Sequence, residues 1–200
     1  MSDWTGNKNS VFKTLGASNH TDKDREEHDF YATESRAIDA LKKKVELPYT
    51  ILEPACGTGC LSERLKELGH NVLSYDLVYR GYGEQQNFFE MLSIPDGCKC
   101  ILTNPPYICA TEFVLHALEL VPMGGLVCMF LKTTFLEGKQ RYNRLFKITP
   151  PEKVLQFSER ILCAKNAEFD YMRKHGGSAV SYAWYVWRKG YKGQTILDWI

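Results

Sequence analysis

Apolar residues recur along this chain in two patterns, short unbroken runs and longer stretches with a period near 3.6 residues. The unbroken runs have the length of buried strands, and they lie at residues 50–53, 72–75, 100–103, 126–131, 154–157 and 179–187. The stretches with a helical period lie between them, at residues 61–68, 110–120 and 139–146. A further helix is predicted ahead of the first run, with Thr33 as its N-cap and Pro48 as its end.

Strands that alternate with helices predict one parallel, doubly wound sheet with helices on both faces. In such a sheet ligands bind beyond the carboxyl ends of the strands, near the point where the strand order reverses. Glu53, Asp76 and Thr103 each end or directly follow a predicted strand. The chemistry is therefore expected in the loops after these three residues.

The chain of 200 residues, 44% of them hydrophobic, has the size and composition of one globular domain. Residues 1–27 are polar and lack a sustained period, so a flexible arm is expected ahead of a domain that spans residues 28–200. No apolar run approaches the roughly 20 residues of a membrane helix, and no secretory signal is visible. The seven cysteines form no CxxC pair and no zinc-ligand cluster, so we expect reduced thiols, a cytoplasmic location and no metal site.

The formal net charge of +1 conceals an uneven distribution. Residues 1–100 carry 12 Lys and Arg against 16 Asp and Glu, whereas residues 101–200 carry 13 against 8. An excess of positive charge in one half suits contact with phosphates. On charge alone, an ordinary solvated surface explains the same numbers at least as well.

A loop with two glycines follows the first predicted strand and has the sequence Glu53-Pro54-Ala55-Cys56-Gly57-Thr58-Gly59. Glycines between a strand and a helix let backbone N–H groups approach a ligand without a Cβ in the way. Asp76 ends the next strand, near the offset at which an acidic side chain meets ribose hydroxyls. A tight turn and a helix cap would explain either feature alone, but together they favour an adenosine-binding site.

The loop Thr103-Asn104-Pro105-Pro106-Tyr107 follows another predicted strand. Its two prolines stiffen the backbone and remove two N–H donors, which makes the Asn104 side-chain oxygen and a neighbouring carbonyl fixed acceptors. Such acceptors can hold both hydrogens of an NH2 group and orient its lone pair. Tyr107 offers a flat face on which a planar substrate can stack. A proline-stiffened turn is the alternative, but the position at a strand end favours transfer to an amino nitrogen.

In this order and spacing, the glycine loop, Asp76 and the Asn-Pro-Pro-Tyr tetrapeptide resemble the class I adenine-N6 DNA methyltransferases. The segment Asp29-Phe30-Tyr31-Ala32-Thr33 is similar to the N-terminal cofactor motif of that family, and the motif order is similar to its gamma arrangement. The resemblance covers roughly residues 28–190. It implies a Rossmann-like class I methyltransferase fold, an α/β fold with a mostly parallel, doubly wound, seven-stranded sheet whose last strand is antiparallel.

The resemblance also implies a role for each matching residue. S-adenosyl-L-methionine (SAM) would be bound by Tyr31, Thr33, Glu53, Pro54, Ala55, Cys56, Gly57, Gly59, Asp76, Leu77, Asn87, Phe88 and Asn104. Catalysis would lie with Asn104, Pro105, Pro106 and Tyr107, where Asn104 and the Pro105 carbonyl accept from the target amino group and Tyr107 stacks on the base. Asn87 stands where the family usually has an acidic residue that meets the adenine of SAM, and Phe88 either stacks on that adenine or belongs to the core.

A second stacking residue for the target base is expected in the loop before the last predicted strand. Phe169 is the candidate, and Lys165 is a candidate substrate contact. Basic and aromatic residues are interleaved between Cys163 and Gly177, which suits phosphate contact and base stacking. A surface loop without a binding role is an equal alternative.

The expected reaction is direct transfer of a methyl group from SAM to N6 of adenine in DNA, without a covalent enzyme intermediate. The tetrapeptide is shared with enzymes that methylate guanine N2 in RNA or a glutamine amide in a protein, so these acceptors stay open. An inactive SAM-binding regulatory module is a further alternative. Because few residues follow the last predicted strand, we expect no target-recognition domain, and either short-site specificity or a partner subunit.

Overall fold

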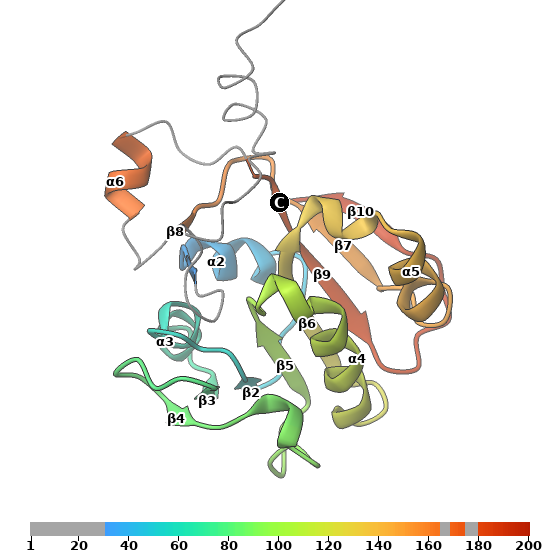
Figure 1. Ribbon diagram of the computed structural model, residues 1–200, viewed down its shortest axis with the longest axis horizontal. Helices are drawn as coiled ribbons and strands as arrows, with labels where there is room; N and C mark the ends of the chain where they lie inside the picture. Colours follow the sequence, from blue (N-terminus) through green and yellow to red (C-terminus); the bar gives the residue numbers. More distant parts are fainter. Residues whose placement is uncertain (1–30, 165–168, 175–179) are drawn as a thin grey trace, which may run out of the picture.

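The computed structural model describes residues 31–164, 169–174 and 180–200, which form a twisted sheet with helices on both faces (Figure 1). The predicted arm at residues 1–27 lies outside the described residues. The strands of the main sheet are β2 (Thr50–Glu53), β3 (Asn71–Asp76), β4 (Glu84–Gln85), β5 (Cys100–Thr103), β6 (Leu126–Lys132), β7 (Lys153–Gln156), β9 (Tyr182–Arg188) and β10 (Ile196–Trp199). A separate pair is formed by β1 (Ala32–Thr33) and β8 (Cys163–Ala164).

The helices occupy the predicted places in the chain, except for α6, which lies where a loop was expected. They are α2 (Arg36–Lys42), α3 (Cys60–Glu67), α4 (Ala110–Leu120), α5 (Lys139–Arg141) and α6 (Phe169–Lys174). The shorter turns are the 3-10 helices η2 (Phe88–Glu90), η3 (Tyr107–Cys109) and η4 (Thr133–Leu136), and the π-helical turn η5 (Tyr142–Phe146), which continues α5.

The strand order in the main sheet is β10-β7-β9-β6-β5-β2-β3-β4. Strand β2 pairs in parallel with β3 on one side and with β5 on the other, so the order reverses at β2. Within the described main sheet, β9 is the only antiparallel strand, and it lies between β6 and β7. The prediction of a mostly parallel, doubly wound sheet is confirmed, and the crevice between the ends of β2 and β5 is the expected ligand site.

The far edge of the sheet differs from the prediction. The antiparallel strand β9 is not the last strand, because β10 follows it and pairs in parallel with β7. The described sheet therefore has eight strands rather than seven. Strand β7 would otherwise present a row of unpaired backbone groups at the edge, and β10 satisfies them.

The predicted N-cap of the first helix is wrong. Thr33 belongs to β1, and α2 begins only after Ser35. The Thr33 side chain is buried, and its hydroxyl accepts a hydrogen bond from Asn104 Nδ2 at 3.0 Å. The hydroxyl is thus directed into the protein, away from the first turn of α2.

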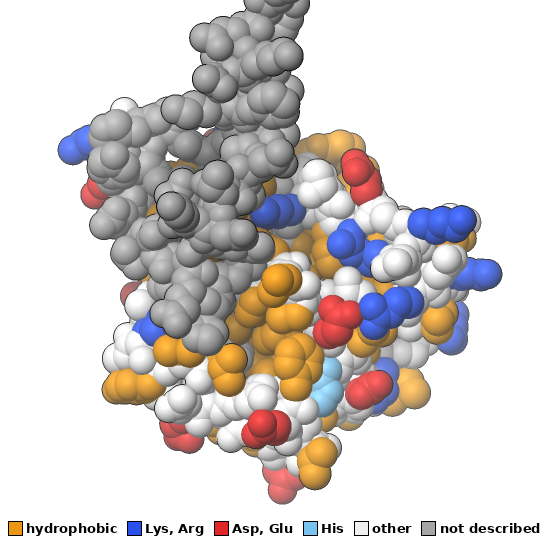
Figure 2. Space-filling model, viewed as in Figure 1, with side chains coloured by type: hydrophobic (Ala, Val, Ile, Leu, Met, Phe, Trp, Pro, Cys, Tyr) orange, Lys and Arg blue, Asp and Glu red, His pale blue; other side chains and the backbone are white. Residues whose placement is uncertain are grey.

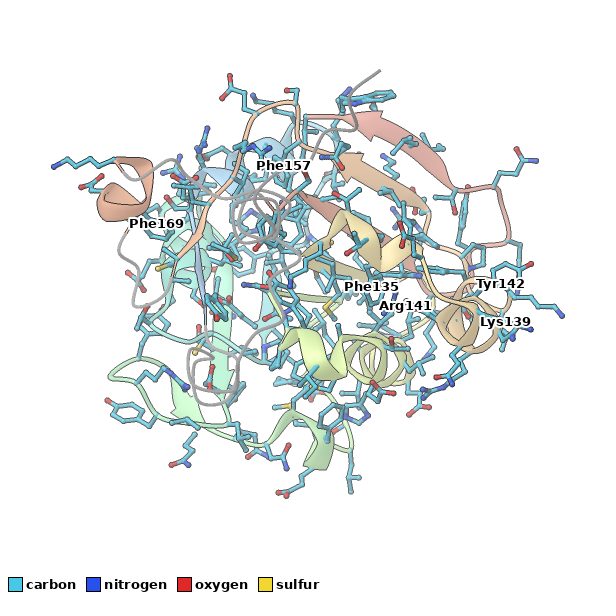
Figure 3. All side chains as sticks on the ribbon, turned by 45° about the horizontal axis from the view of Figure 1, so that its top comes forward. Phe135, Lys139, Arg141, Tyr142, Phe157 and Phe169 are labelled. Carbon is cyan, nitrogen blue, oxygen red and sulfur yellow. The ribbon has the colours of Figure 1, made fainter. Side chains whose placement is uncertain are left out.

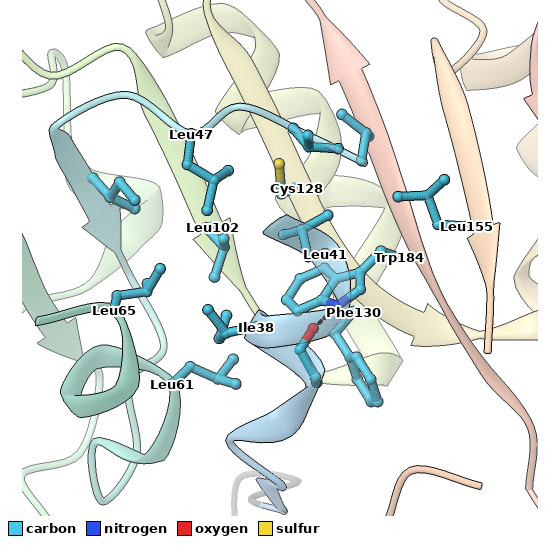
Figure 4. Close-up of a cluster of buried hydrophobic side chains, with 14 of the residues drawn as sticks. Ile38, Leu41, Leu47, Leu61, Leu65, Leu102, Cys128, Phe130, Leu155 and Trp184 are labelled. Atoms are coloured by element: carbon cyan, nitrogen blue, oxygen red, sulfur yellow. Dashed lines mark hydrogen bonds between the residues drawn. The ribbon is translucent and has the colours of Figure 1, made fainter. Parts of the chain in front are cut away.

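Two hydrophobic clusters fill the two faces of the sheet, because side chains on each strand alternate between them. On β6, Phe130 lies in the cluster under α2 and α3, whereas Met129 lies in the cluster under α4. Figure 4 shows the first cluster, in which Trp184 Nε1 donates to the Ala37 carbonyl at 2.8 Å. The aromatic residues of β9 are buried and pack in these clusters: Tyr182, Trp184, Tyr185 and Trp187.

All seven cysteines are free thiols. Among the described residues, no helix combines the length and apolar character needed to cross a membrane. In the same part of the chain, no cluster of three or more His, Cys, Asp or Glu side chains is arranged to hold a metal ion.

Candidate active site

A cavity opens beyond the carboxyl ends of β2, β3 and β5, where the strand order reverses. It encloses about 840 Å³, including space open to solvent at its mouth. All of the predicted cofactor-binding residues line this main cavity except Gly57 and Gly59. The three loops that the sequence singled out are therefore brought together at one site.

The two glycines of the β2–α3 loop do not line the main cavity, but their backbone conformations set the path of a loop whose other residues do. Gly57 has φ 55° and Gly59 has φ 86°, backbone conformations that favour glycine. The Gly57 N–H donates to Asp76 Oδ2 at 2.8 Å. A Cβ on Gly59 would lie 2.7 Å from atoms of the Tyr82 ring, so this position also lacks space for a side chain.

Asp76 holds its own loop together as well as facing the main cavity. Its Oδ1 accepts from the Val78 N–H at 3.0 Å and from the Arg80 guanidinium at 3.4 Å. Arg80 lines the main cavity and was not predicted, although an acidic and a basic residue four positions apart in a ligand-binding loop could have indicated it. The negative charge of Asp76 is thus partly balanced before any ligand is present.

Glu53 is a buried acid at the wall of the same cavity, with 1% of its surface exposed. The Ser62 hydroxyl donates to its Oε2. Burial raises the pKa of Glu53 to about 8, and the Asp76 carboxylate nearby acts in the same direction. Glu53 is therefore mainly a neutral carboxylic acid at pH 7, able to donate as well as accept.

Part of the main cavity has an aromatic lining. Phe88 is 3% exposed, packs against Phe113 at 4.8 Å between ring centroids, and also lines the main cavity, so it belongs to the core and the site at once. Asn87 caps η2, since its Oδ1 accepts from the Phe89 N–H at 3.1 Å and its Nδ2 donates to Glu90 Oε1 at 2.9 Å. Asn87 lines the main cavity as predicted, with its amide already oriented by these two bonds.

The Asn104 side chain has one satisfied end and one unsatisfied end. Its Nδ2 donates to the Tyr31 carbonyl and to the Thr33 hydroxyl, both at 3.0 Å, and lies 3.4 Å from Cys163 Sγ. A backbone carbonyl can only accept, so these partners fix which end of the amide is nitrogen. Asn104 Oδ1 is buried and has no hydrogen-bond partner among the described residues. Because Asn104 lines the main cavity, a hydrogen-bond donor on a bound ligand could satisfy this oxygen.

Cys163 is distant in sequence from three of the predicted site residues but contacts all three. Its Sγ lies 3.6 Å from the Thr33 hydroxyl and 3.5 Å from the Tyr107 hydroxyl, besides its contact with Asn104. Burial raises the pKa of Cys163 and that of Tyr107, so both groups keep their protons near neutral pH. Sequence reasoning did not find Cys163, because its role depends on the pairing of β8 with β1.

The tetrapeptide separates the main cavity from a second cavity. Asn104 and Pro106 line the main cavity, whereas Tyr107 lines the second one, and Pro105 lines neither. The second cavity is bordered by the start of α4, the end of β6 and α5, through Tyr107, Ile108, Ala110, Leu131, Lys132, Thr134, Phe135 and Arg141. The Tyr107 ring packs near Tyr182 at 6.2 Å between centroids, and Lys132 Nζ lies 4.8 Å from the Tyr107 centroid.

Of the two predicted substrate contacts on the late loop, only Phe169 belongs to the described residues. Lys165 lies outside the described residues. Phe169 begins α6, which Figures 1 and 3 show apart from the body of the sheet, and it lines neither cavity. The main cavity is also lined by residues that were not predicted: Ala32, Thr58, Cys60, Leu61, Arg80, Phe89, Cys109 and Phe113.

Solved structures share this fold at low sequence identity. A Listeria monocytogenes protein, provisionally described as a class I S-adenosylmethionine-dependent methyltransferase, matches with a TM-score of 0.54 and 13% identity, over 83% of this chain and 62% of its own. The modification subunit of a provisionally assigned type I restriction enzyme from Vibrio vulnificus YJ016 matches with a TM-score of 0.55 and 14% identity, over 94% of this chain and 48% of its own.

A third similar structure contains a product of methyl transfer. Geranyl diphosphate C-methyltransferase from Streptomyces coelicolor A3(2), in complex with S-adenosyl-L-homocysteine, matches with a TM-score of 0.52 and 9% identity, over 78% of this chain and 75% of its own. This chain spans less than two thirds of the length of the first two neighbours. Neither a family model nor a curated protein sequence matches it. The chain has the Rossmann-like fold of the class I methyltransferases.

Proposed function

We propose that this protein is a SAM-dependent methyltransferase that methylates an exocyclic amino group, with N6 of adenine in DNA as the favoured target. The observation that carries the proposal is the Asn104 amide, whose nitrogen is held by three partners while its buried oxygen has none among the described residues. A target amino group is the donor that this oxygen lacks. The tetrapeptide motif and its place at the strand end support the same assignment.

The main cavity suits SAM in its donor set. Asp76 is a carboxylate suited to ribose hydroxyls, and Phe88 and Phe113 offer an aromatic wall for adenine. Tyr31, Thr33 and Glu53 would meet the methionine end. When bound, SAM supplies an electrophilic methyl group. The neighbour crystallised with S-adenosyl-L-homocysteine supports this choice of cofactor through its shared fold.

The residues of the chain would act on the acceptor by position and by hydrogen bonding. An sp2 amino nitrogen is a poor nucleophile because its lone pair is delocalised into the ring. Asn104 Oδ1 would accept one amino hydrogen, hold the nitrogen in place and favour a lone pair that is localised on nitrogen instead of delocalised into the ring. Positioning of this kind is worth roughly 7–11 kcal/mol in favourable cases. Since Cys163 and Tyr107 keep their protons, they would orient Asn104 rather than act as bases or nucleophiles.

A planar acceptor would occupy the second cavity beside Tyr107. Its aromatic and aliphatic lining, with Phe135 and Ile108, suits a base better than the flexible side chain of a protein glutamine. Guanine N2 in RNA remains the second candidate, because it also presents an amino group on a planar ring. A duplex target would have to be extruded from the stack. A partner subunit for target recognition, a cytoplasmic location, and contacts from Lys165 and Phe169 belong to the same proposal.

The test is transfer of labelled methyl groups from SAM to DNA, RNA and protein, followed by identification of the modified base. We expect N6-methyladenine in DNA, and a fall in turnover on the order of 10²–10³-fold in Asn104→Ala, in line with the loss of one preorganised polar group. Asn71→Ala, which changes an exposed asparagine at the amino end of β3, serves as the matched control. If SAM binds but no acceptor of any class gains a methyl group, the regulatory-module alternative replaces this proposal.

A further inference from the structure

A short basic segment lies beside the second cavity, and only its Arg141 lines that cavity. It consists of α5 and η5, and we call its exposed side the α5–η5 surface, defined by Lys139, Tyr142, Arg144 and Lys147. From Gly138 to Pro151 the sequence contains four Lys and Arg and no acidic residue. Figure 2 shows Lys and Arg side chains gathered on the side of the molecule that α5 occupies in Figure 1.

The four cations of this segment are not equivalent. Arg141 is a structural anchor, because its Nε donates to the Thr111 hydroxyl at 3.3 Å and its Nη1 donates to the Phe135 carbonyl at 2.8 Å. Arg144 pairs with Glu112 at 2.9 Å, with both side chains about half exposed. Lys139 and Lys147 are exposed and form no ion pair within the described ranges. The outward positive charge of the surface therefore comes mainly from these two lysines.

The α5–η5 surface is continuous with the second cavity. Arg141 stacks on the Phe135 ring at 4.2 Å, and both residues line that cavity together with Tyr107 and Lys132. Figure 3 shows Lys139 and Tyr142 on the outer side of α5, with Phe135 and Arg141 further in. A ligand held in the second cavity beside Tyr107 would therefore extend across a cationic surface.

We propose that the α5–η5 surface binds the phosphodiester backbone of a nucleic-acid acceptor, which makes the acceptor a nucleic acid rather than a protein side chain or a small amine. This inference rests on the proposed function of the neighbouring site. Lysines on flexible stems suit phosphates, whose contacts position a strand without reading its sequence. Tyr142, 54% exposed, adds a ring on which a neighbouring base or sugar can pack.

The charge near the α5–η5 surface is mainly positive. Acids near the surface are few: Glu112 is paired with Arg144, and Glu137 lies just before α5. An anionic backbone would therefore meet a net attraction here, which ionic strength should weaken.

The experiment measures the affinity of the full chain for a labelled DNA single strand, the matching duplex and an RNA of the same sequence, over about 50–200 mM salt. The variant is Lys139→Ala with Lys147→Ala. We expect binding to weaken on the order of tenfold, and the slope of log affinity against log salt to shrink by about 2 on the duplex, because each lost phosphate contact contributes about 0.9. The matched control is Lys43→Ala with Lys99→Ala, two exposed lysines at the end of α2 and directly before β5, and it should bind like the parent chain.

Unchanged nucleic-acid binding and an unchanged salt slope in the Lys139/Lys147 variant would overturn the inference, as would an equal loss in the Lys43/Lys99 control. Methylation of a protein or a small amine by a chain that binds no nucleic acid would also overturn it, while leaving the proposed methyltransferase function intact. SAM binding, measured by calorimetry on the same preparations, should not change in either variant. A parent chain that fails to bind SAM counts against the proposed function instead, because neither lysine lies near the main cavity.

Discussion

The main cavity and the α5–η5 surface lie on either side of the Asn104–Tyr107 loop, and they are built on opposite principles. Apart from Asn104 Oδ1, the polar groups described around the main cavity are held by hydrogen bonds within the protein, as in the bonds from Gly57 to Asp76 and from Asn104 to Tyr31. Side chains on the α5–η5 surface are exposed, flexible and cationic, and two of its lysines have no ion-pair partner among the described residues.

This difference indicates which task each region performs. A small ligand with a defined shape is bound best by groups that are fixed in advance, because little ordering is then lost on binding. A long polyanion needs charge within reach rather than exact geometry, since its phosphates are equivalent. Substitutions at the main cavity should therefore change stability and cofactor affinity together, whereas substitutions near the second cavity should change acceptor binding alone.

The largest effect is expected for Asp76→Ala. This change removes acceptors for the Gly57 and Val78 N–H groups and the partner of Arg80, so the glycine loop loses its support as well as its ribose contact. We expect unfolding to become easier by about 2–3 kcal/mol and SAM affinity, measured by calorimetry, to fall at least about 100-fold, equivalent to about 3 kcal/mol. Asp76→Asn keeps one acceptor oxygen and should lose less in both measurements. Full SAM affinity in Asp76→Ala would break the comparison.

Glu53 gives a pH-dependent form of the same prediction. Its pKa is raised in the folded chain to about 8, so the proton that it holds when folded is released on unfolding above pH 4.5. The stabilisation is complete below the unfolded pKa and is lost as the pH rises through 8, by about 5 kcal/mol in total. The free energy of unfolding of the parent chain, measured in urea, should therefore fall from pH 5 to pH 8 relative to that of Glu53→Gln, whose side chain does not titrate. Parallel pH profiles for the two chains would contradict a buried, neutral Glu53.

The contact between Gly59 and Tyr82 allows a smaller, reversible test. Gly59→Ala places a Cβ against the Tyr82 ring and into a left-handed backbone conformation, at a combined cost of about 1–3 kcal/mol. Tyr82→Ala in the same chain should recover the steric part but not the backbone part. Thermal unfolding of the two single variants and the double variant separates the terms. Simple additivity would mean that the Tyr82 ring does not limit the loop.

The sequence predicted the main cavity well because its residues sit at strand ends that the alternating pattern locates. Thr50–Glu53, Cys100–Thr103 and Ala110–Leu120 have the predicted bounds, and the loops that follow the strands meet because parallel strands share one edge. Thr33 was misassigned because a cap and a short strand have similar local sequences, and only pairing with Cys163, 130 positions away, decides between them. The same pairing explains why Cys163 itself was missed.

Position along the chain indicated only one of the residues named here that line the second cavity. Tyr107 was predicted to stack on the substrate, whereas Lys132, Phe135 and Arg141 come from the segment after β6 and were not predicted. That segment was predicted only as the end of a strand followed by a helix. Its role depends on how far η4 and α5 fold back over η3, which periodicity does not encode. Binding surfaces made of exposed side chains leave little trace in a hydrophobic pattern.

The smallest effect is expected at Lys132, where the two regions meet. Its ammonium lies 4.8 Å from the Tyr107 centroid, on a ring that the proposed function assigns to acceptor stacking. Lys132→Met keeps the apolar stem and removes the charge. Because a cation–π contact is worth about 1 kcal/mol, we expect the KM for the acceptor to rise about 3–10-fold. The kcat and the SAM affinity should change less than about twofold. Lys153→Met, another half-buried lysine on the sheet, is the control. A fall in kcat with KM unchanged would place Lys132 in the chemical step, and the separation between a fixed cofactor side and an adaptable acceptor side would then fail at its boundary.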